Sequence, residues 1–333
     1  MKKYEVLNYI IIGLLVLCIV KINSIYSSHT QVIQIQKPQT PTPERIYIPL
    51  IAKSEDRFWD AVQLGAERAA NDYRLQITFE APPSERDIQV QDQLIEEAII
   101  RNPQALAIAA IDAKGVVPFV EEATSKGIPV IAFDSGIDSD LVKTTVSTDN
   151  YAAGQLAAHK MASLIKNEGK VALIVPDNTS ETSINRTKGF VDTIAESYPN
   201  IEVVAVKYGE GDVQKSAEAA KEIIAEHPDI KGIFAANEGS TQGLVIAANE
   251  LGLDGNKIKL IGFDAGRPLL YAIKNGVVAG AITQDPVTIG YRAVVAAYRI
   301  YKGESVPVRI DTGFRWYDRT NMDNLDLKAV LYE

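Results

Sequence analysis

The 333-residue sequence predicts an α/β fold in which two lobes, each built on a parallel sheet, follow one N-terminal apolar helix. Three observations lead to this prediction. From Ile46 onward, short apolar runs alternate regularly with polar turns and amphipathic helical stretches. The runs are apolar throughout, which is typical of parallel strands covered by helices on both faces. There are about ten such runs, too many for one compact lobe, so we expect two lobes of about five strands.

The bulk composition is that of an ordinary globular protein and excludes several function classes. Apolar residues make up 46% of the chain and charged residues 23%. The net charge is −9 without a basic stripe, so nucleic acid is not an expected partner, because phosphate contacts need clustered Lys and Arg. The single cysteine, Cys18, allows no internal disulfide, and the three histidines lack zinc-ligand spacing. We therefore expect no metal and no cofactor.

Residues 1–26 are interpreted as a membrane anchor or a signal segment. Two lysines near the start precede an apolar run at 9–20, and 6–25 is long enough to cross a bilayer as an uncleaved anchor. A lipoprotein signal that uses Cys18 is one alternative, although Leu17 stands where a small residue is usual. A cleaved signal peptide is the other, although no typical cleavage site follows the run. All three interpretations place the globular part outside the cytoplasm, at the cell membrane.

Residues 27–45 form a separate segment rich in Gln, Thr, Ser and Pro. Such a composition buries too little apolar surface to pack into a core. The segment is therefore expected to be an extended spacer that holds the globular part away from the membrane.

The globular part contains two series of candidate strands separated by helical stretches. The first series is 46–51, 75–79, 105–110, 129–133 and 143–147. The second series is 170–175, 201–207, 232–235, 259–263 and 278–283. Helical periodicity is clear at 58–73, where apolar and small residues recur on one face. The intervening helices supply the right-handed crossovers that parallel strands need.

Polar and aromatic side chains gather where these strands end, which is where open parallel sheets bind ligands. The candidate ligand-binding residues are Asp56, Phe58, Trp59, Asp134, Arg186, Asn237, Asp264 and Gln284. Taken singly, each has an ordinary explanation as a helix cap, a core aromatic or a surface arginine. Together, carboxylates, amides and a guanidinium offer the mixed donors and acceptors that suit a neutral polyol. The two adjacent aromatics would pack on the apolar face of a sugar ring.

Several segments of the globular part resemble a known family. They are I-P-V-I-A-F-D-S from Ile128, V-S-T-D-N-Y-A-A-G from Val146, N-R-T-K-G-F from Asn185, F-A-A-N-E from Phe234, L-I-G-F-D from Leu260 and A-I-T-Q-D-P-V-T-I-G from Ala281. Over 46–333 the chain resembles the type I periplasmic sugar-binding proteins, the ribose-binding-like family that shares its fold with the effector domains of LacI-type repressors. A repressor itself is excluded, because the N-terminus is an apolar span and not a basic helix-turn-helix.

The resemblance implies two Rossmann-like lobes joined by a hinge of three chain crossings. The crossings would lie near Thr148, Gln284–Asp285 and Asp311–Thr312. The N-terminal lobe would comprise 46–148 plus 285–311, and the C-terminal lobe 149–284 plus 312–333. The family's ligand positions fall on the eight residues named above.

Three departures from the family's pattern bear on the sugar and not on the fold. Ser135 follows Asp134, whereas the family member with the most similar pattern has an arginine at the position after this aspartate. The family pattern has an aromatic residue of the second lobe near position 211, whereas the nearest aromatic in this chain is Tyr208. Position 56 is Asp, where the family pattern has Asn. The resemblance therefore does not imply ribose itself.

The resemblance implies a binding protein and not an enzyme. We expect the lobes to close on a monosaccharide, a pentose or a hexose, and to present it to a membrane partner. An uncleaved anchor favours a co-receptor for a sensor histidine kinase, because it holds the lobes beside a membrane protein at high effective concentration. The alternative is the substrate-binding lipoprotein of a sugar ABC transporter, whose partner is a permease. A remote alternative is a doubly wound hydrolase that uses Asp134 and Asp264 as an acid/base pair, although no G-x-S-x-G motif is present.

Overall fold

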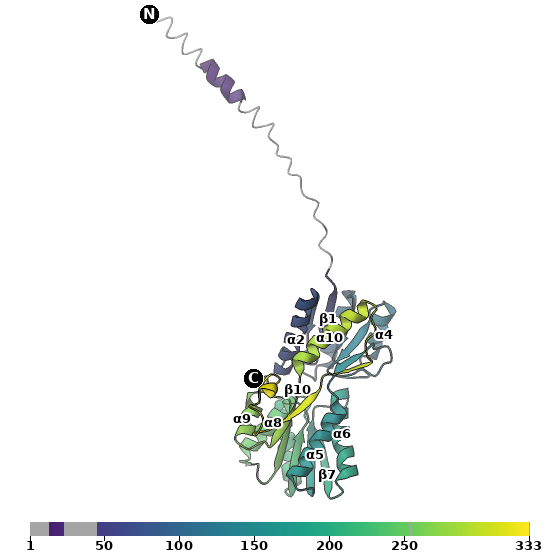
Figure 1. The fold of residues 1–333 in the computed structure, drawn as a ribbon, viewed down its shortest axis with the longest axis vertical. Helices are drawn as coiled ribbons and strands as arrows, with labels where there is room; N and C mark the ends of the chain where they lie inside the picture. Colours follow the sequence, from purple (N-terminus) through teal and green to yellow (C-terminus); the bar gives the residue numbers. More distant parts are fainter. Residues whose placement is uncertain (1–12, 23–44, 254, 333) are drawn as a thin grey trace, which may run out of the picture. The chain divides into compact units, whose positions relative to one another are not determined.

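The computed structural model describes residues 13–22, 45–253 and 255–332. Residues 13–22 form a helix, while the rest of the predicted anchor and nearly all of the predicted spacer lie outside the described residues. Within the described ranges, no helix is both long and apolar enough to cross a bilayer. The unit that begins at Arg45 contains both sheets (Figure 1).

Two six-stranded sheets form the centres of the two lobes (Figure 1). In spatial order, the first sheet is β11 (Arg309–Asp311), β5 (Thr145–Ser147), β4 (Val130–Phe133), β3 (Leu106–Ile108), β1 (Tyr47–Ile51) and β2 (Gln76–Glu80). The second is β12 (Phe314–Tyr317), β10 (Gly280–Gln284), β9 (Lys259–Phe263), β8 (Ile230–Ala235), β6 (Gly169–Val175) and β7 (Ile201–Tyr208). Neighbouring strands are parallel, except that β12 runs antiparallel to β10. The predicted α/β fold with two lobes is confirmed.

The sequence prediction missed two edge strands, β11 and β12, so each sheet has six strands and not five. β11 has only three residues, and its charged ends read as a turn. β12 is the four-residue segment F-R-W-Y. Each one is placed by pairing with a strand distant in sequence, β5 for β11 and β10 for β12. Such pairing leaves little local signal in so short a segment.

Helices cover both faces of each sheet. In the first lobe, α2 (Arg57–Tyr73) and α10 (Pro286–Tyr301) pack on one face, and α3 (Ile88–Ile100) and α4 (Val117–Ser125) on the other. In the second lobe, α5 (Asn150–Leu164) and α6 (Glu181–Ser197) cover one face. The opposite face carries α7 (Val213–Glu226), α8 (Glu238–Glu250), α9 (Arg267–Lys274) and the short α11 (Leu325–Lys328). This double cover explains why the central strands are apolar throughout.

The chain passes from one lobe to the other three times: between β5 and α5, between β10 and α10, and between β11 and β12. The first and third crossings are joined by hydrogen bonds. The backbone N–H of Thr312 donates to the carbonyl oxygen of Ser147 at 3.1 Å. The backbone N–H of Asp149 donates to the Asp311 carboxylate at 3.2 Å. The expected three-crossing hinge is confirmed, while the exact lobe boundaries stay a prediction.

Two glycines bring α5 and α6 close together. A Cβ atom on Gly154 of α5 would lie 2.2 Å from the carbonyl oxygen of Arg186 on α6. A Cβ atom on Gly189 of α6 would lie 2.1 Å from the carbonyl oxygen of Tyr151 on α5. Both distances are far below van der Waals contact, so only glycine permits this approach. The short distance between the two helices therefore fixes the position of the Arg186 backbone, from which its side chain extends.

We expect Gly154→Ala to lower the free energy of unfolding by about 1–3 kcal/mol, because the added methyl group pushes the backbone of α6 away. Urea unfolding measures the change. Ser163→Ala, at an exposed position of the same helix, should change the free energy by less than about 0.5 kcal/mol. An unchanged unfolding midpoint for Gly154→Ala would contradict this account of the packing.

Candidate functional site

A cavity of about 340 Å³ lies between the lobes and is lined by residues from both. This volume is within the range of roughly 300–1,000 Å³ that is usual for small-molecule sites. All eight residues singled out from the sequence line it: Asp56, Phe58, Trp59, Asp134, Arg186, Asn237, Asp264 and Gln284. The fold therefore brings the set together, because the carboxyl ends of parallel strands share one edge of each sheet. Their role as ligand contacts stays a prediction.

Asp56 and Asn237 each cap a helix at the cavity. An Asp56 carboxylate oxygen accepts from the backbone N–H of Trp59 at the start of α2, at 3.2 Å. The Asn237 side-chain oxygen accepts from the backbone N–H of Ser240 at the start of α8, at 2.9 Å. The ordinary capping explanation thus holds for both residues. It does not compete with a role at the cavity, since capping uses an oxygen of Asn237 and leaves its amide N–H₂ available.

Phe58 and Trp59 form an aromatic wall of the cavity. Their ring centroids are 5.2 Å apart and the rings are nearly perpendicular, at 88°. Trp59 also meets Phe133 at the end of β4 edge to face, with the centroids 5.9 Å apart. Both residues are buried, so each one is a core aromatic and a cavity wall at once. The packing against Phe133 holds the Trp59 ring in place.

Asp134 and Asp264 occupy matching positions in the two lobes. Each follows the last residue of a central strand, β4 and β9, and each has a positive φ, 57° and 69°. This left-handed backbone conformation is uncommon outside glycine, although Asp adopts it more readily than most residues. Both side chains are almost fully buried. Burial raises the pKa of both carboxyls, and that of Asp264 reaches about 6 although Arg186 and Gln284 oppose the rise.

Arg186 is held from three sides by the second lobe. Its Nε donates to the Asn150 side-chain oxygen at 2.9 Å, and Nη1 donates to the carbonyl oxygen of Ala236 at 2.8 Å. The guanidinium carbon lies 3.7 Å from the centroid of the Phe263 ring. A guanidinium has five N–H donors, so donors remain for a ligand in the cavity.

Gln284, the last residue of β10, joins this group at the second crossing between the lobes. Its Nε2 donates to the Asp264 carboxylate at 2.8 Å. Its Oε1 is buried and accepts no hydrogen bond from the described part of the chain. A buried acceptor without a donor is costly, and Gln284 itself lines the cavity.

The set of eight leaves out five charged residues that line the cavity: Lys53, Glu55, Glu85, Asp212 and Glu238. Lys53 and Glu238 each lie two or three residues beyond a central strand, β1 and β8. The rule that selected the other residues could therefore have found these two. Glu85 lies in the loop between β2 and α3, where nothing local distinguishes it from a surface glutamate.

Glu238 is fixed by two neighbours on the second lobe side of the cavity. The Tyr332 hydroxyl donates to one carboxylate oxygen at 2.9 Å, and the Gln242 amide donates to the other at 2.8 Å. Burial, with the nearby charges of Asp56 and Asp264, raises the pKa of Glu238 to about 8. Tyr332 also packs against Phe58, with ring centroids 6.3 Å apart. The C-terminal segment thus helps to shape the site.

Acidic groups outnumber basic ones around the cavity. The acidic residues are Glu55, Asp56, Glu85, Asp134, Asp212, Glu238 and Asp264. The basic residues are Lys53 and Arg186. An anionic ligand such as a phosphate would be repelled by this excess of negative charge. The arrangement suits a neutral ligand with many hydroxyl groups, which both donate and accept hydrogen bonds.

Comparisons with known proteins connect the chain to a family. Residues 46–305 match the family model described as the periplasmic binding protein domain. The D-ribose/D-allose-binding protein of Pseudomonas aeruginosa is 26% identical over 273 residues, which cover 79% of this chain and 85% of that protein. The ribose import binding protein of Bacillus subtilis is 28% identical over 261 residues, which cover 77% and 83%.

Two solved structures extend the comparison to the fold. A carbohydrate transporter solute binding protein from Agrobacterium radiobacter, in complex with D-arabinose, is 32% identical with a TM-score of 0.84. The match covers 87% of this chain and all of that one, 100%. An ABC transporter solute binding protein from Agrobacterium vitis with bound D-fucose is 31% identical with a TM-score of 0.82, covering 86% and 100%.

We expect the stability of the unliganded protein to fall as the pH rises from about 5 to about 8. Burial raises the pKa values of Glu85, Glu238 and Asp264 to about 7, about 8 and about 6. In this window the folded state therefore binds more protons than the unfolded chain, and the free energy of unfolding decreases with pH. Carboxyls with a lowered pKa, such as Asp212, change the free energy of unfolding only at pH values below this window.

Urea unfolding at a series of pH values measures this dependence. Glu238→Gln should flatten the curve, because its amide does not titrate. Glu121→Gln, at an exposed position on α4, should leave the slope unchanged. A free energy of unfolding that rises between about pH 5 and about pH 8 would contradict the prediction.

Proposed function

Since the chain belongs to the periplasmic binding protein family, we propose that it binds one neutral monosaccharide, a pentose or a hexose, outside the cytoplasm. The single observation that carries this proposal is the cavity between the lobes, lined by all eight predicted residues. Two relatives have names that refer to ribose or allose, and two solved neighbours hold D-arabinose and D-fucose. These sugars support a monosaccharide as the class of ligand for this chain.

The chemistry of the cavity supports the same class. Carboxylates of Asp134 and Asp264 accept hydrogen bonds from sugar hydroxyls, and the free N–H groups of Arg186 donate to hydroxyl oxygens. Trp59 offers a flat apolar surface for the carbon face of the sugar ring. A binding protein needs only these contacts and no reacting group, so we propose that the sugar leaves unchanged.

Ligand-dependent closure follows from the placement of the residues. Asp134 extends from the first lobe, while Arg186 and Asp264 extend from the second. A sugar can bond to all three only when the lobes are close together. Contacts across the cleft accompany this arrangement, such as the ion pair of 3.1 Å between Arg86 and Asp212.

We propose a transport permease as the membrane partner. One relative is named for ribose import and one solved neighbour for ABC transport, which supports the interpretation that was the alternative from sequence alone. The prediction of a sensor histidine kinase as partner rested on an uncleaved anchor, and most of the anchor segment lies outside the described residues. The co-receptor and the membrane anchor therefore stay predictions.

Asp134→Ala, Arg186→Ala and Asp264→Ala should each weaken sugar binding about ten- to hundredfold, because each removes charge-assisted hydrogen bonds worth about 1.5–3 kcal/mol. The probes are D-arabinose, D-fucose, D-ribose and D-allose, screened by thermal shift and then titrated by calorimetry.

Lys188→Ala, at an exposed position on the same helix as Arg186, is the matched control and should bind as the unsubstituted protein does. Unchanged affinity in all three cavity variants would contradict the site. A bound sugar recovered in chemically altered form would contradict the proposal of a binding protein and favour the hydrolase.

A strain that lacks this protein should lose uptake of the radiolabelled sugar and keep sugar-induced transcription, because a transport binding protein delivers ligand and does not report it. Uptake and transcript levels are measured in parallel, with the restored gene as control. Normal uptake together with lost induction would instead support the co-receptor.

A further inference from the structure

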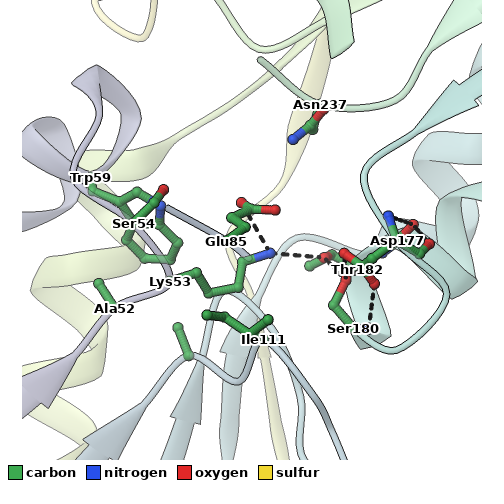
Figure 2. Close-up of polar contacts among 12 residues, drawn as sticks. Ala52, Lys53, Ser54, Trp59, Glu85, Ile111, Asp177, Ser180, Thr182 and Asn237 are labelled. Atoms are coloured by element: carbon green, nitrogen blue, oxygen red, sulfur yellow. Dashed lines mark hydrogen bonds and ion pairs between the residues drawn. The ribbon is translucent and has the colours of Figure 1, made fainter. Parts of the chain in front are cut away.

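Lys53 and Glu85 form a largely buried ion pair in the cavity wall, outside the set of eight residues. The Lys53 Nζ lies 3.4 Å from Glu85 Oε1, and the two side chains are only 5% and 13% exposed. Nζ also donates to the Thr182 hydroxyl of the second lobe at 3.5 Å. Figure 2 shows both contacts converging on the Lys53 nitrogen. The pair thus orients one oxygen of Glu85 toward a fixed cation.

The other oxygen of Glu85 has no such partner. Oε2 is buried and forms no hydrogen bond within the described part of the chain. Burial raises the pKa of Glu85 to about 7, against the opposing charge of Lys53. A buried carboxylate oxygen without a donor is destabilising, so the arrangement is incomplete in the protein alone.

Gly211 of the second lobe lies against this free oxygen. A Cβ atom on Gly211 would stand 3.2 Å from Glu85 Oε2, and its φ of +68° also favours glycine. The second lobe therefore approaches Glu85 with bare backbone. Glu85 and Gly211 both line the cavity, so a ligand there lies beside the Glu85 carboxylate.

We propose that Glu85, oriented by Lys53, determines specificity by accepting a hydrogen bond from one hydroxyl of the bound sugar. This inference rests on the proposed function. It predicts that a sugar which lacks that hydroxyl binds less tightly than its parent. The alternative role for the pair is a clamp between the lobes, since Lys53 also reaches Thr182. A clamp would change the affinity of all sugars by the same factor.

The experiment compares the parent sugar with its monodeoxy analogues. The parent is whichever of D-arabinose, D-fucose, D-ribose and D-allose the unsubstituted protein binds most tightly. Calorimetry gives the affinity of each analogue for the unsubstituted protein and for Glu85→Ala. For one position only, we expect removal of the hydroxyl to weaken binding about tenfold or more in the unsubstituted protein and to have almost no effect in Glu85→Ala. Such a result is a coupling between one hydroxyl and one residue.

Glu85→Gln provides a second variant in case Glu85→Ala does not fold. The amide of the glutamine keeps the size of the carboxylate but not its charge. Removal of the hydroxyl that Glu85 recognises should therefore cost less affinity, while removal of any other hydroxyl should cost the same as before. Glu121→Ala removes the same charge at an exposed position on α4. In this variant, the loss of affinity on removing each hydroxyl should be the same as in the unsubstituted protein. Folded Glu85 variants that keep the full penalty at every position would overturn the proposal, even if their overall affinity falls. Failure of the unsubstituted protein to bind any probe would instead count against the proposed function.

Discussion

The site depends on holding the guanidinium of Arg186 and one buried carboxylate from each lobe, Asp134 and Asp264, around one cavity. Burial raises the pKa of both aspartates; Lys53 and then Arg186 oppose the rise for Asp134, and Arg186 opposes it for Asp264. An unpaired charge at such depth would be costly. The same groups keep unused donors and acceptors, because the hydrogen bonds within the protein satisfy only part of their capacity. A polyhydroxyl ligand between the lobes would supply the missing partners.

The fold places these groups through simple constraints on the backbone. Gly154 and Gly189 set the distance between α5 and α6, and this distance fixes the position of the Arg186 backbone. Left-handed backbone conformations after β4 and β9 turn the two aspartates out of their strands. The aromatic wall serves two purposes, since Trp59 packs on Phe133 and also lines the cavity. Rigid elements therefore carry the groups, and three chain crossings join the two halves of the site.

Much of this arrangement could be predicted from the sequence, because parallel strands bring their carboxyl ends together whatever the detail of the packing. Asp134 and Asp264 follow apolar runs that are unmistakable strands. Glu85 could not be predicted, since only the tertiary structure brings it to Lys53 and Gly211. β11 and β12 were missed for the same reason, as short edge strands owe their conformation to a distant partner. Asp56 and Asn237 show that capping a helix and lining a cavity are compatible roles.

A crystal structure of the protein with its bound sugar tests the central claim most directly. The sugar is the one that gives the largest thermal stabilisation among D-arabinose, D-fucose, D-ribose and D-allose. The account predicts a sugar ring against Trp59, with hydroxyls bonded to Asp134 from one lobe and to Arg186 and Asp264 from the other. A sugar bound outside this cavity, or bound by one lobe alone, would contradict it.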